Sequence, residues 1–186
     1  MKAREVDSLD PDGALADNAE RIVRVRLAEL YGFMPAAADP AEVVALHDMR
    51  IAAKRLRYVL ELTAPCFGPY ARTAVKLTRE LQDVLGEIHD CDVQLPEAAA
   101  FAERLLAADA EALRAAAGGA DDVDPVLLAQ VPHARDHAGL AALQTHLRTR
   151  RELLYDRFIE RWAQLERKGF RARLEYAVSE RADAQA

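Results

Sequence analysis

The stretch LHDMRIAAKRLRYVLEL, residues 46–62, decides the fold of this chain. It contains no proline or glycine, and its alanines and straight-chain residues are good helix formers. The segment DPAE at residues 39–42 is typical of a helix start, with an acidic N-cap, a proline at the first helical position and a glutamate at the capping-box position. Pro65 cannot continue a helix. We therefore expect a central helix over residues 40–64.

One edge of this helix is cationic. At about 100° per residue, four side chains fall within an arc of about 80°; they are His47, Arg50, Lys54 and Arg57. Apolar side chains occupy the far side and the positions just beyond the stripe, namely Met49, Leu56 and Leu60, and Ile51, Tyr58 and Leu62. A helix that is apolar on nearly every other face packs against several neighbours, which predicts that the cationic edge is confined between packed elements.

Charge is segregated along the chain. The net charge is −6, yet residues 49–79 hold seven cations and one anion, Glu61, a local excess of six positive charges. Removing cations from water costs several kcal/mol unless they are paired. We therefore expect the missing anion to be a ligand, bound at a concentrated positive site within an acidic exterior.

Composition indicates one all-α domain. The 186 residues are 51% hydrophobic and 30% charged, and they contain no alternating runs typical of strands. Cys66 and Cys91 form no metal-ligand pair and are expected to be reduced thiols of a cytoplasmic protein. The sequence shows no apolar signal core and no run of about 18 apolar residues, so we expect no membrane partner. It also shows no phosphate-cradling glycine loop and no nucleophile motif, and we expect no cofactor.

The remaining elements are read in chain order. Acidic residues 1–13 are expected to form a flexible tail and residues 14–178 the helical domain, an antiparallel bundle of about five to six helices around a basic channel or groove. Within it, residues 118–135 are expected to be a flexible loop with a short turn at 126–128, and residues 179–186 a polar tail. The individual helices are expected at 14–32, 69–88, from about 90 to 117, 136–168 and 170–178.

A second cationic stripe lies on the helix at 69–88. Its members fall within an arc of about 60°; they are Arg72, Lys76 and Arg79, followed by Asp83. The four-residue connection from the central helix forces the two helices to be antiparallel neighbours. We expect the two stripes to face each other across a groove.

The helix at 136–168 can add a third basic wall through Arg148 and Arg151, unless Glu152 and Glu160 neutralise it.

Helix junctions and cores complete the expectations. Gly86 and the segment HDCD at 89–92 are expected to separate two helices, with an aspartate capping the second. The core of that second helix is predicted to consist of Phe101, Leu105, Leu106 and Leu113. The remaining histidines, His133, His137 and His146, show no partner pattern and are expected at the surface.

Two blocks carry a family resemblance. HDMRIAAKRLRYVLEL at 47–62 and LQDVLGEIHDCDV at 81–93 resemble the CHAD family, whose name refers to conserved histidines in an α-helical setting, and HLRTRRELLYDRFIERW at 146–162 resembles its last long helix. The resemblance implies a helical bundle whose basic channel binds inorganic polyphosphate, without catalysis, in some members at polyphosphate granules. By motif match, the resemblance implies polyphosphate-binding positions at His47, Arg50, Lys54, Arg55, Arg57 and His89. On the next helix it adds Arg72, Lys76 and Arg79. Family members are often longer, with two related halves, so a homodimer stays open here.

Three other functions remain open. The doublets His47-Asp48 and His89-Asp90 resemble those of HD-type metal-dependent phosphohydrolases, although the neighbouring cations oppose a bound metal and no fourth ligand is evident. A nucleic-acid partner is disfavoured because aromatic residues rarely interleave with the basic ones. Binding of an acidic protein segment is the third alternative.

Overall fold

The computed structural model describes residues 2–181 and confirms the all-α class. Within that range there are six α-helices and no strand; they are α1 (Leu15–Gly32), α2 (Met34–Ala37), α3 (Val43–Thr63), α4 (Tyr70–Ala117), α5 (Asp136–Arg167) and α6 (Phe170–Ser179). Two short 3-10 helices, η1 (Ala64–Cys66) and η2 (Pro125–Gln130), lie in the connections. No helix among these residues is both long and apolar enough to cross a membrane.

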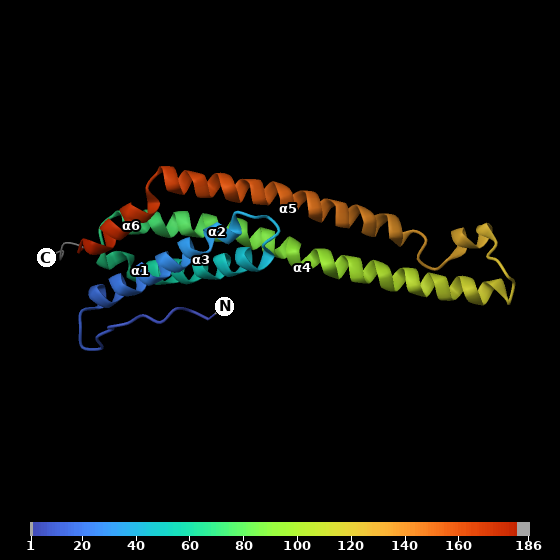
Figure 1. Ribbon diagram of the computed structural model, residues 1–186, viewed down its shortest axis with the longest axis horizontal. Coiled ribbons are helices and arrows are strands. Elements are labelled where there is room, and N and C mark those ends of the chain that lie inside the picture. The colour runs from blue at the N-terminus through green and yellow to red at the C-terminus, as the bar shows by residue number, and fades with distance from the viewer. Residues whose placement is uncertain (1, 182–186) are drawn as a thin grey trace. The chain divides into compact units, whose positions relative to one another are not determined.

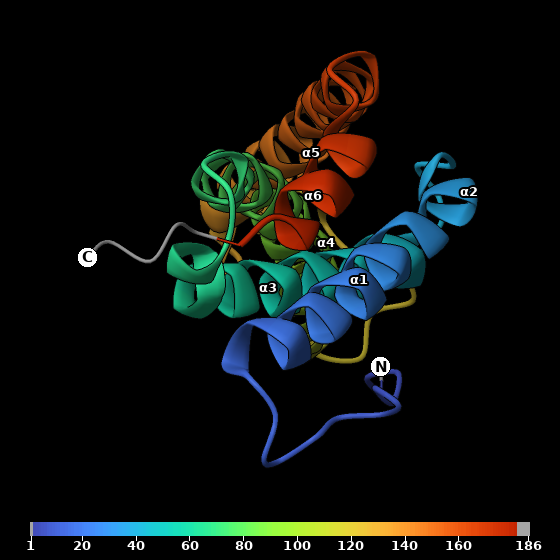
Figure 2. The same ribbon diagram turned by 90° about the vertical axis from the view of Figure 1, so that its left-hand side faces the viewer.

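The chain divides into two compact units. The first comprises the described residues up to His89 together with those from Leu154 onward, and the second spans Asp90–Leu153. In the first unit α1 packs along α3 and also contacts α6, and both views show α1 and α3 side by side (Figures 1 and 2). In the second unit the later part of α4 and the earlier part of α5 form a hairpin joined by residues 118–135 (Figure 1).

The first unit contains the hydrophobic core. Side chains from five helices are fully buried there, among them Leu27, Leu30, Met49, Leu56, Leu60, Leu81, Leu85, Phe158, Leu165, Phe170 and Leu174. Each such side chain stabilises the fold by about 1.5–3 kcal/mol relative to exposure. The aromatic rings of Tyr31 and Trp162 pack at a centroid distance of 4.8 Å, which joins α1 to the end of α5.

Polar side chains on α1 bond neighbouring acidic and backbone groups. Arg24 pairs with Glu20 at 2.9 Å, as expected for a solvent-facing arginine one turn away. The segment before α1 is bonded to the helix, since the backbone oxygen of Arg4 accepts a hydrogen bond from Arg26 at 2.9 Å. The side chain of Asn18 donates to the backbone oxygen of Asp10 in the same segment.

The start of α3 differs from the prediction. The helix begins at Val43 rather than at Pro40, and its N-cap Glu42 makes no side-chain capping bond. The Asp39 carboxylate instead accepts from the backbone N–H of Ala41 at 2.8 Å. Asp39 therefore stabilises a turn ahead of the helix, which delays the first helical residue.

The predicted break at residues 86–92 is wrong. A single helix, α4, runs through Gly86, the segment 89–92 and Pro96. Asp92 lies inside α4 and therefore caps no new helix. Its carboxylate pairs with Arg151 on α5. Pro96 removes one backbone donor, yet α4 continues past it.

The second unit has little core. Of its side chains only Cys91, Asp109 and Leu147 are buried. Phe101 and Leu106, predicted as core residues, are exposed, and Leu105 and Leu113 are half-buried. Two helices alone can bury only one narrow stripe on each partner, which leaves apolar residues beside that stripe in solvent.

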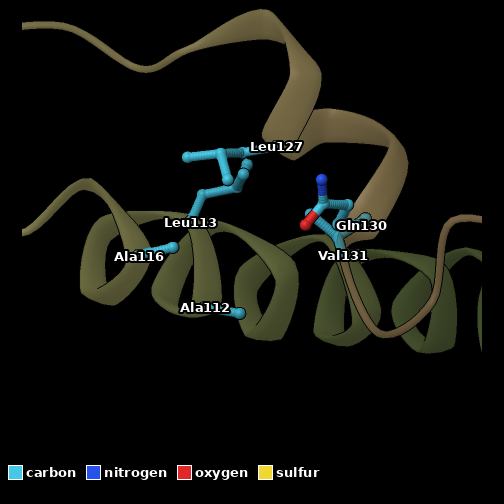
Figure 3. Close-up of a pocket in the computed structure, with 6 residues that line it drawn as sticks. All are labelled: Ala112, Leu113, Ala116, Leu127, Gln130 and Val131. Carbon is cyan, nitrogen blue, oxygen red and sulfur yellow. The ribbon is translucent and has the colours of Figure 1, made fainter.

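Loop residues after α4 dock on it through η2. The short turn expected at 126–128 is present within η2, and the side chain of Leu127 approaches Leu113 (Figure 3). Beside this contact lies a hollow of about 130 Å³ lined mainly by aliphatic side chains, together with Gln130. The hollow has no charged lining residue, so it is not the positive site that the sequence predicts.

A buried carboxylate fastens the end of the hairpin. Asp109 is 4% exposed, and its two oxygens bond His133 Nδ1 at 2.8 Å and His137 Nε2 at 2.7 Å. The backbone N–H of His133 also donates to Asp109 at 3.1 Å. The expectation that these two histidines are surface residues without a partner is therefore wrong.

Replacing Asp109 by Asn should loosen the hairpin end in a pH-dependent way. Burial tends to raise the pKa of Asp109, but hydrogen bonds from His137 and His133 outweigh it and hold this pKa below its ordinary value of 3.8. A carboxylate with a lowered pKa stabilises the folded state above the ordinary value and loses that effect as pH falls through the folded-state value.

The measurement is amide hydrogen exchange of residues 131–140 in wild type and D109N at matched pH. We expect faster exchange in the variant at neutral pH and a difference that shrinks below about pH 4. Asp121→Asn, at an exposed position of the same unit, is the control and should leave exchange unchanged. Equal exchange in wild type and D109N at neutral pH would contradict the role of Asp109.

Candidate functional site

Burial on one side of α3 fixes where its cations point. Met49, Leu56 and Leu60 are completely buried, so the rotation of the helix about its axis is set by the core. The edge that carries His47, Arg50, Lys54 and Arg57 lies on a different side of the helix and is partly or fully accessible.

Three contacts show that α3 and the first part of α4 are antiparallel neighbours. His47 Nδ1 and His89 Nδ1 lie 3.2 Å apart. A Cβ atom on Gly86 would lie 3.7 Å from Arg50 Nε, so Arg50 crosses α4 at the one position without a side chain. Further along, Glu61 connects Arg57 with Arg79.

These contacts share one register, which places Lys54 opposite Gln82. We call this line of side chains the cationic seam; its members are His47, Arg50, Lys54 and Arg57 on α3 and Arg79, Gln82, Gly86 and His89 on α4. The sequence-based expectation that Arg79 comes close to the cations of α3 agrees with this geometry.

Buried donors in the cationic seam lack an acceptor. Arg50 Nε and Arg57 Nε are buried and have no hydrogen-bond partner within the described chain. The buried Oε1 of Gln82 likewise lacks a donor there. An unsatisfied buried polar group costs about 1–3 kcal/mol, and more when charged. Two guanidinium groups in this state define a site that an oxyanion can complete.

Tyr58 holds two of the cations in place. Its ring centroid lies 4.6 Å from Arg57 Cζ and 5.7 Å from Lys54 Nζ. Such cation–π contacts are worth about 0.5–1 kcal/mol at exposed sites. The Tyr58 ring thus contacts both Arg57 and Lys54 and helps to hold these two cations near each other.

Glu61 is the acidic residue of the site. Its Oε1 lies 2.7 Å from Arg79 Nη2 and 3.9 Å from Arg57 Nε. The hydrogen bond and the charge of Glu61 raise the pKa of Arg79 above its ordinary value. One carboxylate oxygen therefore lies between a guanidinium of α3 and a guanidinium of α4.

The His47–His89 contact fixes a proton arrangement. Two ring nitrogens at this distance bond only if one carries hydrogen and the other presents its lone pair. At least one of the two imidazoles is therefore neutral when the bond is made. The rings are tilted by 49° with centroids 4.5 Å apart.

Other predicted residues of α4 lie elsewhere. Lys76 is 78% exposed at its side chain and lies 4.0 Å from Glu80, which also bonds Arg161 at 2.7 Å. Arg72 is exposed, and Arg55 on α3 is half-buried. The second stripe therefore divides: Arg79 turns toward α3, whereas Lys76 turns toward Glu80 and Arg161.

The two arginines predicted on α5 belong to the second unit. Arg151 is committed to its ion pair with Asp92 and Arg148 is exposed. Asp92 on α4 therefore neutralises Arg151.

One premise about α3 is wrong. Leu62 is 80% exposed and Tyr58 is 46% exposed, so the helix is not packed on nearly every face. Solvent reaches the outer side of the cationic seam, and Lys54 is exposed there. The seam has a packed inner side with Arg50 and Arg57 partly buried, and an open outer side.

Sequence reasoning missed Glu61, Gln82 and Gly86 as parts of the site. The sequence predicts a helix break at Gly86, where α4 is in fact continuous. Pairing the two helices in antiparallel order places Gly86 opposite Arg50. A glycine at that position leaves space for the long arginine side chain. Residues 2–181 contain no group of three His, Cys, Asp or Glu side chains arranged to hold a metal ion.

The all-α fold thus brings a line of cations on two antiparallel helices, α3 and α4, together in the first unit. The model of the CHAD domain matches residues 2–99, more than half of the chain. The chain therefore belongs to the CHAD family. None of the curated proteins matches it, and neither does any solved structure.

Gly86→Ala should stabilise the protein. Glycine inside a helix is less favourable than alanine by about 0.5–1 kcal/mol, and the added Cβ would make only an ordinary contact with Arg50 Nε at 3.7 Å. Chemical denaturation should show this gain. Gly86→Leu is the counterpart: its longer side chain must displace Arg50, so it should be less stable than the alanine variant. Destabilisation by G86A would contradict the spacing of α3 and α4.

Proposed function

We propose that the protein binds inorganic polyphosphate, or a similar phosphate polyanion, along the cationic seam and does not catalyse a reaction on it. The observation that carries the proposal is the pair of buried guanidinium nitrogens, Arg50 Nε and Arg57 Nε, without an acceptor. Membership of the CHAD family supports it, because polyphosphate binding is a property of that family.

The dimensions suit a linear polyanion. Arg50 and Arg57 are seven residues apart, or about 10 Å along a helix that rises 1.5 Å per residue. Successive phosphates repeat every few Å, so several can meet His47, Arg50, Lys54 and Arg57 in turn. Arginine can bind a phosphate through two donors, while lysine supplies a compact charge.

Predicted ligands outside the cationic seam take secondary parts in the proposal. Arg55, Arg72 and Lys76 remain predicted contacts for phosphates that extend beyond the seam. Arg148 and Arg151 remain predicted contacts as well, although Arg151 would first have to leave Asp92. A homodimer, a closed channel, a cytoplasmic location and association with granules also stay predictions of this proposal.

Two alternatives find less support in the geometry. A metal-dependent phosphohydrolase needs a ligand set, and His47 and His89 direct ring nitrogens at each other. Single-stranded nucleic acid needs free aromatic faces on which bases stack. Tyr58 is the aromatic residue beside the seam, and its ring already packs against Lys54 and Arg57.

Charge reversal in the cationic seam should abolish binding. The double variant Lys54→Glu/Arg57→Glu places two anions where phosphates are expected, while the buried Met49, Leu56 and Leu60 keep the helix packed. Affinity for polyphosphate is measured by titration calorimetry over a salt series. The logarithm of the binding constant should fall by about 0.7 per phosphate contact for each decade of salt.

Arg104→Glu/Arg114→Glu on α4 is the matched double variant, with two exposed arginines reversed that are not among the predicted contacts. It should bind far better than the α3 variant. Single-stranded DNA serves as competitor, and DNA that displaces polyphosphate at equal charge concentration would favour the nucleic-acid alternative. Unchanged polyphosphate affinity in folded K54E/R57E protein would refute the proposed site.

Binding should tighten as pH falls below neutral. A phosphate next to His47 favours its protonated form, so proton uptake accompanies binding. Titrations between about pH 5.5 and 8 should show rising affinity for wild type and a flatter profile for His47→Ala. His146→Ala, exposed in the second unit, is the control. Equal pH dependence in wild type and H47A would remove His47 from the site.

A further inference from the structure

Glu61 occupies the position where a bound phosphate is needed. Glu61 is the one anion among residues 49–79, a stretch that holds seven cations. Its Oε1 contacts Arg79 and lies near Arg57, one residue from each helix of the cationic seam. A phosphate oxygen that bridges the same two guanidinium groups would have to take the place of that carboxylate oxygen.

The carboxylate is placed to move away. Glu61 is 30% exposed and Arg79 is 54% exposed at their side chains, so both can change rotamer in solvent. Arg57 does not need Glu61 for its position, because it also packs against the ring of Tyr58. Glu61 leaves Arg57 Nε without a hydrogen bond, so it satisfies this arginine only in part.

We infer that Glu61 is an internal competitor of the ligand: its carboxylate neutralises Arg57 and Arg79 in the empty cationic seam and leaves them when polyphosphate binds. This inference rests on the proposed function and adds to it a residue that sets affinity. An internal carboxylate lowers the affinity for every anion that uses these two arginines. It also keeps the empty site from holding two adjacent unneutralised guanidinium groups.

Glu61→Gln tests the inference. The amide keeps the size of the side chain and removes its negative charge, so a phosphate no longer competes with it. We expect polyphosphate affinity to rise about two- to fivefold, in the range of an exposed ion pair. The salt slope should change little, because in wild type the phosphate already contacts both arginines once Glu61 has left them.

Glu20→Gln is the matched control. Glu20 on α1 also bonds two arginines, Arg24 at 2.9 Å and Arg181 at 2.8 Å, and its side chain is comparably exposed. The control therefore removes the same charge and the same number of arginine contacts away from the cationic seam. Both variants are checked by circular dichroism and thermal melting before titration.

The outcomes separate the two claims. If wild type fails to bind polyphosphate, the proposed function fails. If wild type binds and E61Q gains no more affinity than E20Q, the inference about Glu61 fails while the proposed function stands. Weaker binding by folded E61Q would show that Glu61 positions the arginines instead of competing for them, which also overturns the inference.

Discussion

Burial of one side of α3 is the constraint on which the rest of the site depends. Met49, Leu56 and Leu60 are fully excluded from solvent, and this fixes the helix in rotation as well as in position. The cations of α3 cannot then turn away from α4 without exposing that apolar side, whose burial is worth about 1.5–3 kcal/mol per residue. The unfavourable proximity of several positive charges is therefore maintained by hydrophobic packing on the opposite side of the same helix.

The helices were predictable wherever a local signal decides them. The bounds of α5 and α6 agree with the sequence to within about one residue, because Gly169 ends one helix with a positive φ of 63° that favours glycine. The start of α3 and the continuity of α4 were missed. In both places an aspartate that resembles an N-cap has another partner: Asp39 bonds a turn and Asp92 bonds Arg151. Propensity cannot show which partner a carboxylate selects.

The candidate site was predictable as a list of cations, not as an arrangement. Periodicity identified the stripe from His47 to Arg57, but it grouped Arg79 with Lys76, which turns toward Glu80. It also could not pair Asp109 with His133 and His137, since these residues are 24 and 28 positions apart and meet only through the hairpin. Contacts of this kind depend on the register between helices, which no single helix encodes.

A net charge of −6 is compatible with a polyanion site because of distance and screening. At physiological ionic strength the Debye length is about 8 Å, so a ligand at the cationic seam responds mainly to charges within a few residues of it. Arg50 and Arg57 are also partly buried, where charges interact more strongly than in water. The acidic remainder of the chain then mainly disfavours weak, long-range encounters between the protein and a polyanion. If the proposed site binds polyphosphate, this combination favours an anion that fits between α3 and α4 over one that only touches the surface.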